Sequence, residues 1–146
     1  MRPRFLLDVN VPIAVLSKDS PHHDAAVSWL RDAVARGAEV TVLAESLAAA
    51  VRLLSNARAW QHPTPPAEAV TAVDSLVEAT KARVVGAGWE AWQEFIRLTS
   101  AMTLTTRMVP DALIASAALA LGATIVTFDR GLNSYPGVRS LILTSA

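Results

Sequence analysis

Four acidic residues occupy places where an α/β fold would bring their side chains together: Asp8, Glu45, Asp111 and Asp129. Asp8 and Asp129 each close a short apolar run, whereas Asp111 follows Pro110 and opens a long one, from 112 to 121. Carboxylates at the carboxyl ends of buried parallel strands point into the crevice where α/β proteins bind ligands. We therefore expect an acidic crevice.

Several carboxylates in one crevice repel each other and raise one another's pKa values unless a cation lies among them. Hard oxygen ligands of this kind suit Mg²⁺ or Mn²⁺. Such a metal lowers the pKa of its bound water and polarises a phosphoryl oxygen, which are the requirements of phosphodiester hydrolysis. The four residues therefore predict a divalent-metal site that acts on phosphate.

Alternating strands and helices are expected to position these residues. Short apolar runs predict five strands, over 5–9, 39–43, 83–85, 124–128 and 138–143. Helical spacing predicts six helices, over 12–16, 21–36, 44–54, 66–80, 89–98 and 110–121, with Ser20 as an N-cap and Gly122 as a stop. Strands that alternate with helices imply right-handed crossovers and a sheet covered on both faces. The expected fold is a three-layer α/β/α sandwich with a central, mostly parallel five-stranded sheet.

The amino-acid composition excludes several classes of protein. The 146 residues suit one domain, and no apolar run approaches the roughly 18 residues that a membrane helix needs. The absence of cysteine excludes disulfides and thiolate metal sites, and is compatible with a cytoplasmic location. The net charge is zero, from 13 basic and 13 acidic residues. Bulk electrostatics therefore cannot hold nucleic acid, and any such binding requires a local site or a partner.

Blocks of sequence along nearly the whole chain resemble the PIN-domain ribonucleases, and more narrowly the VapC toxins of bacterial VapBC toxin–antitoxin systems. These blocks are Leu6-Leu7-Asp8-Val9-Asn10-Val11, His22-His23-Asp24-Ala25-Ala26, Trp29-Leu30, Val51-Arg52-Leu53-Leu54-Ser55-Asn56 after Glu45, Pro110-Asp111-Ala112 and Thr127-Phe128-Asp129-Arg130-Gly131-Leu132. One departure lies around Glu45, which in many relatives is about two residues nearer the arginine-containing segment. No other acid between Glu39 and Glu68 fits this place better.

The resemblance implies a single PIN domain over residues 1–146 and a Mg²⁺- or Mn²⁺-dependent endoribonuclease that restrains translation and growth. By position, the family's catalytic and metal-binding acids fall on Asp8, Glu45, Asp111 and Asp129, with Asp8 and Asp111 the strongest ligand candidates. Asp129 would complete the ligand set or act through water, and Glu45 would hold a second metal or orient the attacking water. The implied partners are RNA, a VapB-like antitoxin and a second copy of the chain, giving a homodimer and, with antitoxin, a heterotetramer or larger assembly.

Each candidate also has a purely structural interpretation. Asp8 and Asp129 are common residue types at strand ends and turns, and Asp111 and Glu45 are acids in the first turn of a helix. Asn10 would either orient an acid or metal-bound water or cap the following helix, and Thr127 would either orient Asp129 or be an ordinary buried hydroxyl. Four structural coincidences at one sheet edge, in a family-like order, are the less economical explanation.

Two other functions are open on the sequence. A PIN-like domain that has lost activity would be a binding scaffold, although all four acids are present. A haloacid-dehalogenase-like phosphatase opens with Asp-x-Asp, but position 10 is Asn and no lysine other than Lys81 follows Lys18. His22 and His23 are adjacent on a helix start, so they point in different directions and do not form a metal site. Trp89, Trp92 and Phe95 have helical spacing, which favours core or dimer contacts.

Overall fold

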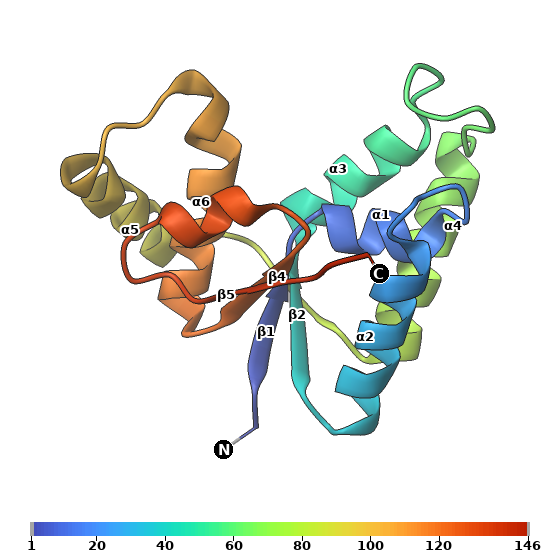
Figure 1. Ribbon diagram of the computed structural model, residues 1–146, viewed down its shortest axis with the longest axis horizontal. Helices are drawn as coiled ribbons and strands as arrows, with labels where there is room; N and C mark the ends of the chain where they lie inside the picture. The colour runs from blue at the N-terminus through green and yellow to red at the C-terminus, as the bar shows by residue number, and fades with distance from the viewer. Residues whose placement is uncertain (1, 146) are drawn as a thin grey trace.

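The computed structural model describes residues 2–145 and has a five-stranded sheet at its centre (Figure 1). The strands are β1 (Arg4–Leu7), β2 (Glu39–Leu43), β3 (Arg83–Val85), β4 (Thr124–Thr127) and β5 (Ser140–Ile142). They lie in the order β3-β2-β1-β4-β5, and all four pairings are parallel. The expected α/β fold with a parallel five-stranded sheet is confirmed.

Helices cover both faces of this sheet and form the outer layers (Figure 1). They are α1 (Asn10–Leu16), α2 (His23–Ala35), α3 (Ala44–Leu54), α4 (Pro66–Thr80), α5 (Gly88–Ala101) and α6 (Val109–Leu121), with short 3-10 turns η1 (Thr106–Met108) and η2 (Arg130–Ser134). In Figure 1, α5 and α6 lie to one side of the sheet, and α1 to α4 lie to the other. The central strands are thus shielded from water on both faces, as in other parallel sheets, whereas the edge strand β3 is largely exposed.

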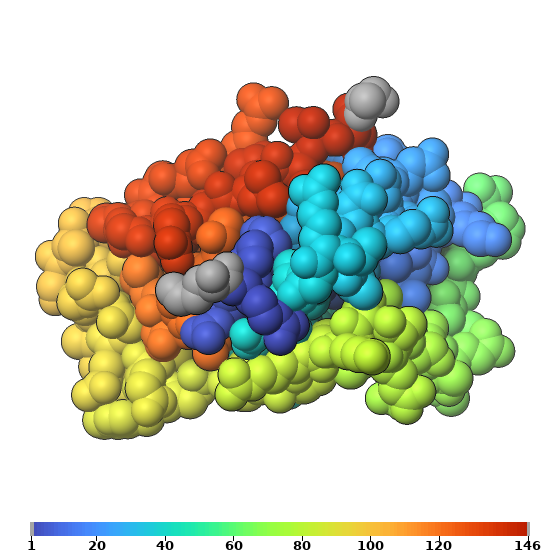
Figure 2. Space-filling view, turned by 90° about the horizontal axis from the view of Figure 1, so that it is seen from below, coloured from blue at the N-terminus to red at the C-terminus, as the bar shows by residue number. Residues whose placement is uncertain are grey.

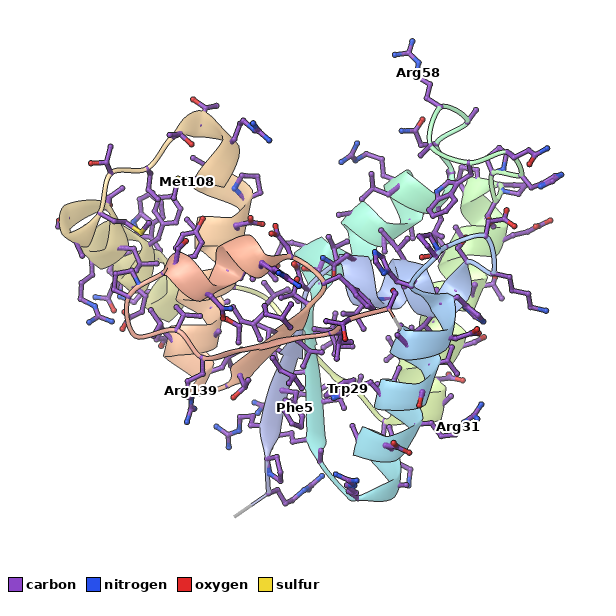
Figure 3. The ribbon with its side chains drawn as sticks, viewed as in Figure 1. Phe5, Trp29, Arg31, Arg58, Met108 and Arg139 are labelled. Carbon is purple, nitrogen blue, oxygen red and sulfur yellow. The ribbon has the colours of Figure 1, made fainter. Side chains whose placement is uncertain are left out.

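The apolar pattern of β1 explains this arrangement. Leu6 and Leu7 are both buried and point to opposite faces, since successive side chains of a strand alternate. Leu6 packs in the core formed with α5 and α6, whereas Leu7 packs in the core formed with α1 and α2. Phe5 shares the face of Leu7 and meets Trp29 of α2 edge to face at 5.1 Å between ring centroids (Figure 3). A continuous apolar run in the sequence therefore becomes the central strand.

The most apolar helix, α6, carries Asp111 in its first turn. Pro110 suits this first turn because proline has no backbone N–H to leave unpaired there. Gly122 ends the helix in the left-handed conformation, with φ 63° and ψ 37°, which glycine adopts without a steric penalty. The buried residues Ala112, Ala115 and Ala118 let α6 approach the sheet closely, so the position of Asp111 is set by tight packing.

Element boundaries differ from the expectation at several ends, including the starts of α1 at Asn10 and α6 at Val109 and the end of α5 at Ala101. Strands β1 and β4 end at Leu7 and Thr127, one or two residues early, so that the acids follow them in loops. Helix α2 begins at His23 and not at Pro21, because the Ser20 hydroxyl accepts from the His22 N–H and closes a turn instead of capping the helix. Strand β5 has three residues, shorter than the expected 138–143.

Figure 2 shows the molecule from the edge at which the strands begin, opposite to the acidic candidates. The N-terminal segment, in dark blue, lies there among segments from distant parts of the sequence. Arg4 donates to the Leu121 carbonyl and Arg139 to the Gly122 carbonyl, which places positive charge at the carboxyl end of α6. Among residues 2–145, no helix combines the length and apolar character needed to cross a membrane.

Candidate active site

Asp8 lies at the carboxyl end of the central strand, where its side chain is held by three donors. Its Oδ1 accepts from the backbone N–H of Val9 at 2.8 Å, and its Oδ2 accepts from the Thr127 hydroxyl at 2.8 Å and the Asn10 amide at 3.3 Å. Only 5% of the residue is exposed. Burial raises the pKa of Asp8, the hydrogen bonds from Thr127 and Val9 oppose that rise, and the charge of Asp129 adds to it.

Asn10 and Thr127 link the end of β1 to the end of β4. The Asn10 amide nitrogen donates to the Thr127 hydroxyl at 3.1 Å, and its carbonyl oxygen accepts from the Phe128 N–H at 3.3 Å. The Thr127 hydroxyl in turn accepts from the Asp129 N–H at 3.0 Å. Asn10 is the first residue of α1 and makes no side-chain capping bond, so the capping interpretation is wrong. Both side chains orient the segments that carry Asp8 and Asp129.

Asp111 enters the same crevice from the start of α6. Its pKa is raised to about 6, first by burial, then by the charges of Asp8 and Asp129 and by a side-chain hydrogen bond with Asp129. These causes require the three carboxyl groups to lie close together, although 103 residues separate Asp8 from Asp111 in sequence. The structure therefore brings three of the four predicted acids into one electrostatically coupled group.

Asp129 combines a turn role with its place in this group. It caps η2, with Oδ1 accepting from the Gly131 N–H at 2.8 Å, and the residue as a whole is exposed. A Cβ added at Gly131 would approach Asp129 Oδ1 at 3.1 Å, so glycine leaves room for this contact. Asp129 can therefore both cap the turn and take part in the site. Its Oδ1 accepts the hydrogen bond of the turn, and its Oδ2 is not used by that bond.

Glu45 is placed at the same edge of the sheet but turned elsewhere. It lies in the first turn of α3, directly after β2, and its Oε2 accepts from the Ala87 N–H at 3.1 Å. Its other oxygen lies 3.5 Å from the position a Cβ would take at Gly86, in the loop between β3 and α5. The charges that raise the pKa of Asp111 are those of Asp8 and Asp129. The side chain of Glu45 is therefore outside the coupled group in this conformation.

The donor set suits a hard divalent cation. All candidate ligands are carboxylates, and the pKa values of Asp8 and Asp111 are raised first by burial and then by the charges of neighbouring aspartates, which a bound cation would offset. Within residues 2–145, no three His, Cys, Asp or Glu side chains form a ready-made metal cage. The charge of the three aspartates thus favours the binding of a cation. In this conformation, however, their oxygens do not surround a single point as the ligands of a bound metal do.

Other polar candidates are positioned for structural roles. His23 contacts the Ala14 carbonyl at 2.8 Å, and the His22 ring stacks on Phe128 with centroids 4.3 Å apart, so the two histidines do diverge. Tyr135 is a residue of the site that the sequence did not indicate. It is 97% buried, and the charges of Asp111 and Asp129 add to the effect of burial in raising its pKa. Tyr135 follows a turn and belongs to no strand or helix, so no hydrophobic periodicity in the sequence indicates that it is buried near the site.

Comparison with known proteins decides the family. The family model described as the PIN domain matches residues 5–138, which span every acid of the site. Over 134 residues the chain is 32% identical to ribonuclease VapC43 of Mycobacterium tuberculosis, covering 91% of this chain and 90% of that protein. This chain is a PIN-domain protein of the VapC ribonuclease family. The resemblance that the sequence motifs carried is confirmed.

Further relatives of this VapC chain agree. Ribonuclease VapC31 of M. tuberculosis is 27% identical over 137 residues, covering 94% of the chain and 96% of that protein. Among solved structures, VapBC2 from Rickettsia felis, bound to a DNA fragment from its promoter, aligns with a TM-score of 0.73. That alignment covers 97% of this chain and 99% of the other at 15% identity, so it supports the fold.

Proposed function

We propose that this VapC protein is a metal-dependent endoribonuclease whose catalytic centre is built on Asp8, Asp111 and Asp129. The observation that carries the proposal is that buried Asp8, half-buried Asp111 and exposed Asp129 lie near enough for their charges to act on one another, where β1 and β4 end and α6 begins. Asn10 and Thr127 hold two of them through hydrogen bonds. A structural role alone does not explain why the fold tolerates this repulsion.

Mg²⁺ or Mn²⁺ is the proposed cofactor, with Asp8, Asp111 and Asp129 as its ligand candidates. When bound, the ion would supply an activated water and neutralise charge on the scissile phosphate. The three carboxylates would hold the ion, and because β1 and α6 are both tightly packed, the segments that carry Asp8 and Asp111 have little freedom to move. Glu45 is proposed to hold a second ion or to orient the attacking water. Its side chain accepts a hydrogen bond from the Ala87 N–H and is therefore not a ligand candidate for the first ion in this conformation.

The experiment that tests this proposal is a cleavage assay with purified protein and fluorescently end-labelled RNA. We expect cleavage with Mn²⁺ or Mg²⁺ and a fall of at least about tenfold when EDTA removes the metal, because the activated water is then lost. Returning Mn²⁺ should restore the rate. Cleavage that is indifferent to EDTA would contradict the metal proposal, and an absence of cleavage on all RNAs would favour an inactive binding scaffold.

A VapB-like antitoxin is the proposed regulator. Support comes from the solved complex of VapBC2 from Rickettsia felis, which shares this fold. The coupled aspartates offer a negative target for a basic side chain of such a partner. In the same cleavage assay, an equimolar amount of the cognate antitoxin is expected to suppress the rate of RNA cleavage. The complex of the two proteins is expected to contain at least two copies of each chain.

A homodimer through α5 is proposed from its exposed apolar face. Trp89, Trp92 and Ile96 are 66%, 49% and 50% exposed, and their spacing places them on one side of the helix. Trp92 also stacks on Phe95 at 5.5 Å between centroids, which makes a flat aromatic surface. Exposed apolar patches of this kind mark association surfaces in folded proteins.

Trp92→Glu is expected to weaken this dimer at least about fivefold, because a charge would be buried in an apolar interface. Sedimentation velocity over a range of protein concentrations measures the effect. Gln93→Glu is the matched control, since it adds the same charge to the next residue, which is also exposed on α5. A wild-type protein that remains monomeric at all concentrations argues against the interface and leaves the nuclease proposal intact.

A further inference from the structure

Tyr135 joins the two segments that carry Asp111 and Asp129. It directly follows η2, the 3-10 turn that Asp129 caps. Its hydroxyl donates to the backbone carbonyl of Met108 at 3.1 Å, and Met108 is the N-cap of α6, three residues before Asp111. Met108 is labelled in Figure 3 beside the start of α6. A single side chain therefore spans the gap between the two acid-bearing segments.

Packing fixes the ring of Tyr135, just as the hydrogen bond to Met108 fixes its hydroxyl. The residue is 3% exposed and belongs to the core that also contains Leu132 of η2 and Ala112 of α6. A buried ring has few conformations, so a hydrogen bond at its tip defines a distance between the two segments it touches. Within residues 2–145, this side-chain-to-backbone bond joins the flank of η2 to the start of α6, alongside the contact between the Asp111 and Asp129 carboxyl groups themselves.

We infer that Tyr135 is a positioning residue of the active site, which sets the separation of Asp111 and Asp129 through its hydrogen bond to Met108. The inference rests on the proposed function, since it concerns the ligand geometry of that same site. Burial and then the negative charges of both aspartates raise the pKa of Tyr135 above its ordinary value, so the phenol is protonated and donates at neutral pH. Hydrogen-bond partners that orient metal ligands typically change metal affinity or activity roughly 10- to 100-fold when lost.

Tyr135→Phe is the test, because it removes the hydroxyl and preserves the ring. We expect Mn²⁺ affinity, measured by isothermal titration calorimetry, to fall roughly tenfold. We expect kcat for RNA cleavage to fall by a similar factor, with KM for RNA unchanged, since the phenol lies in the core and away from substrate. The melting temperature should move little, because one neutral hydrogen bond contributes only about 1 kcal/mol.

Ser134→Ala is the matched control, because it removes a neighbouring hydroxyl whose bond, to the Gly131 carbonyl, stays inside η2. Unchanged Mn²⁺ affinity and kcat in this variant support the positioning role. The inference is overturned if Tyr135→Phe binds Mn²⁺ as wild type does, or if Ser134→Ala loses as much. A wild-type protein that binds Mn²⁺ but cleaves no RNA refutes the proposed function alone, and the calorimetric comparison still decides the role of Tyr135. A wild-type protein that binds no metal overturns both.

Discussion

Asp8→Asn is expected to lower the rate of RNA cleavage by more than roughly 100-fold. Loss of a residue that only orients a metal ligand already costs about 10- to 100-fold, and Asp8 is proposed as a ligand itself. The fold should be retained with a lower melting temperature, because asparagine has the same shape but its amide nitrogen cannot accept from the donors that Asp8 now faces. The measurement is the initial rate of cleavage of end-labelled RNA with saturating Mn²⁺, together with a thermal melt of the same sample.

Two further variants make this result specific. Glu45→Gln is expected to reduce the rate by less than about tenfold, because Glu45 is bonded to Ala87 and lies outside the coupled aspartates. Asp74→Asn, on the exposed side of α4, should have no effect. Full metal-dependent activity of Asp8→Asn would falsify the assignment of the site. A larger loss of activity in Glu45→Gln than in Asp8→Asn would indicate that the catalytic residues lie nearer to α3 than proposed.

Acid pH is expected to inactivate the enzyme at subsaturating metal. The pKa of Asp111 is raised to about 6, so protons compete with the cation below that pH. A single competing proton lowers metal affinity tenfold for each pH unit below the pKa, which gives about 100-fold at pH 4. Calorimetric Mn²⁺ titrations between pH 4 and 7.5 measure this dependence. A flat profile above pH 5 would show that Asp111 does not bind the ion.

The stability of the metal-free protein should change with pH in the opposite sense. Between the ordinary aspartate pKa of 3.8 and about 6, the folded state binds more protons at Asp111 than the unfolded state does. The contribution of Asp111 to the free energy of unfolding therefore rises as the pH falls through this range. Thermal melts in EDTA are expected to show this slope in the wild type and a weaker slope in Asp111→Asn. Equal slopes would argue that the burial of Asp111 is smaller than the structure indicates.

Much of the fold was predictable because each element has a local signal. The bounds of α3, α4, β2 and β3 are as expected, since proline, glycine and apolar periodicity mark their ends. Helix α2 was placed two residues early because Ser20 and Pro21 are typical of both a helix start and a turn. The Ser20 hydroxyl accepts from the His22 N–H and so closes a turn, a local bond that the residue types alone do not distinguish from a helix cap.

The acidic site was predictable in position and less so in orientation. Strand ends and a helix start place Asp8, Asp111 and Asp129 at one edge of the sheet, and these signals are visible in the sequence. The direction of the Glu45 side chain depends on the Ala87 N–H, which arrives 42 residues later in the chain. The bridge from Tyr135 to Met108 is likewise a contact across 27 residues with no repeating pattern. Single long-range hydrogen bonds of this kind leave no local trace.

The pairing of β1 with β4 also determines when activity can appear during synthesis. Asp8 is made well before its partner Thr127, which follows 119 residues later, and only then can the two strands close around the carboxylate. A nascent chain that has not yet produced β4 keeps Asp8 without this hydrogen bond and β1 without one of its neighbours. Contacts so distant in sequence also form late in folding. A translation product that stops before β4 should therefore not cut RNA, so activity is expected only after the sheet is complete.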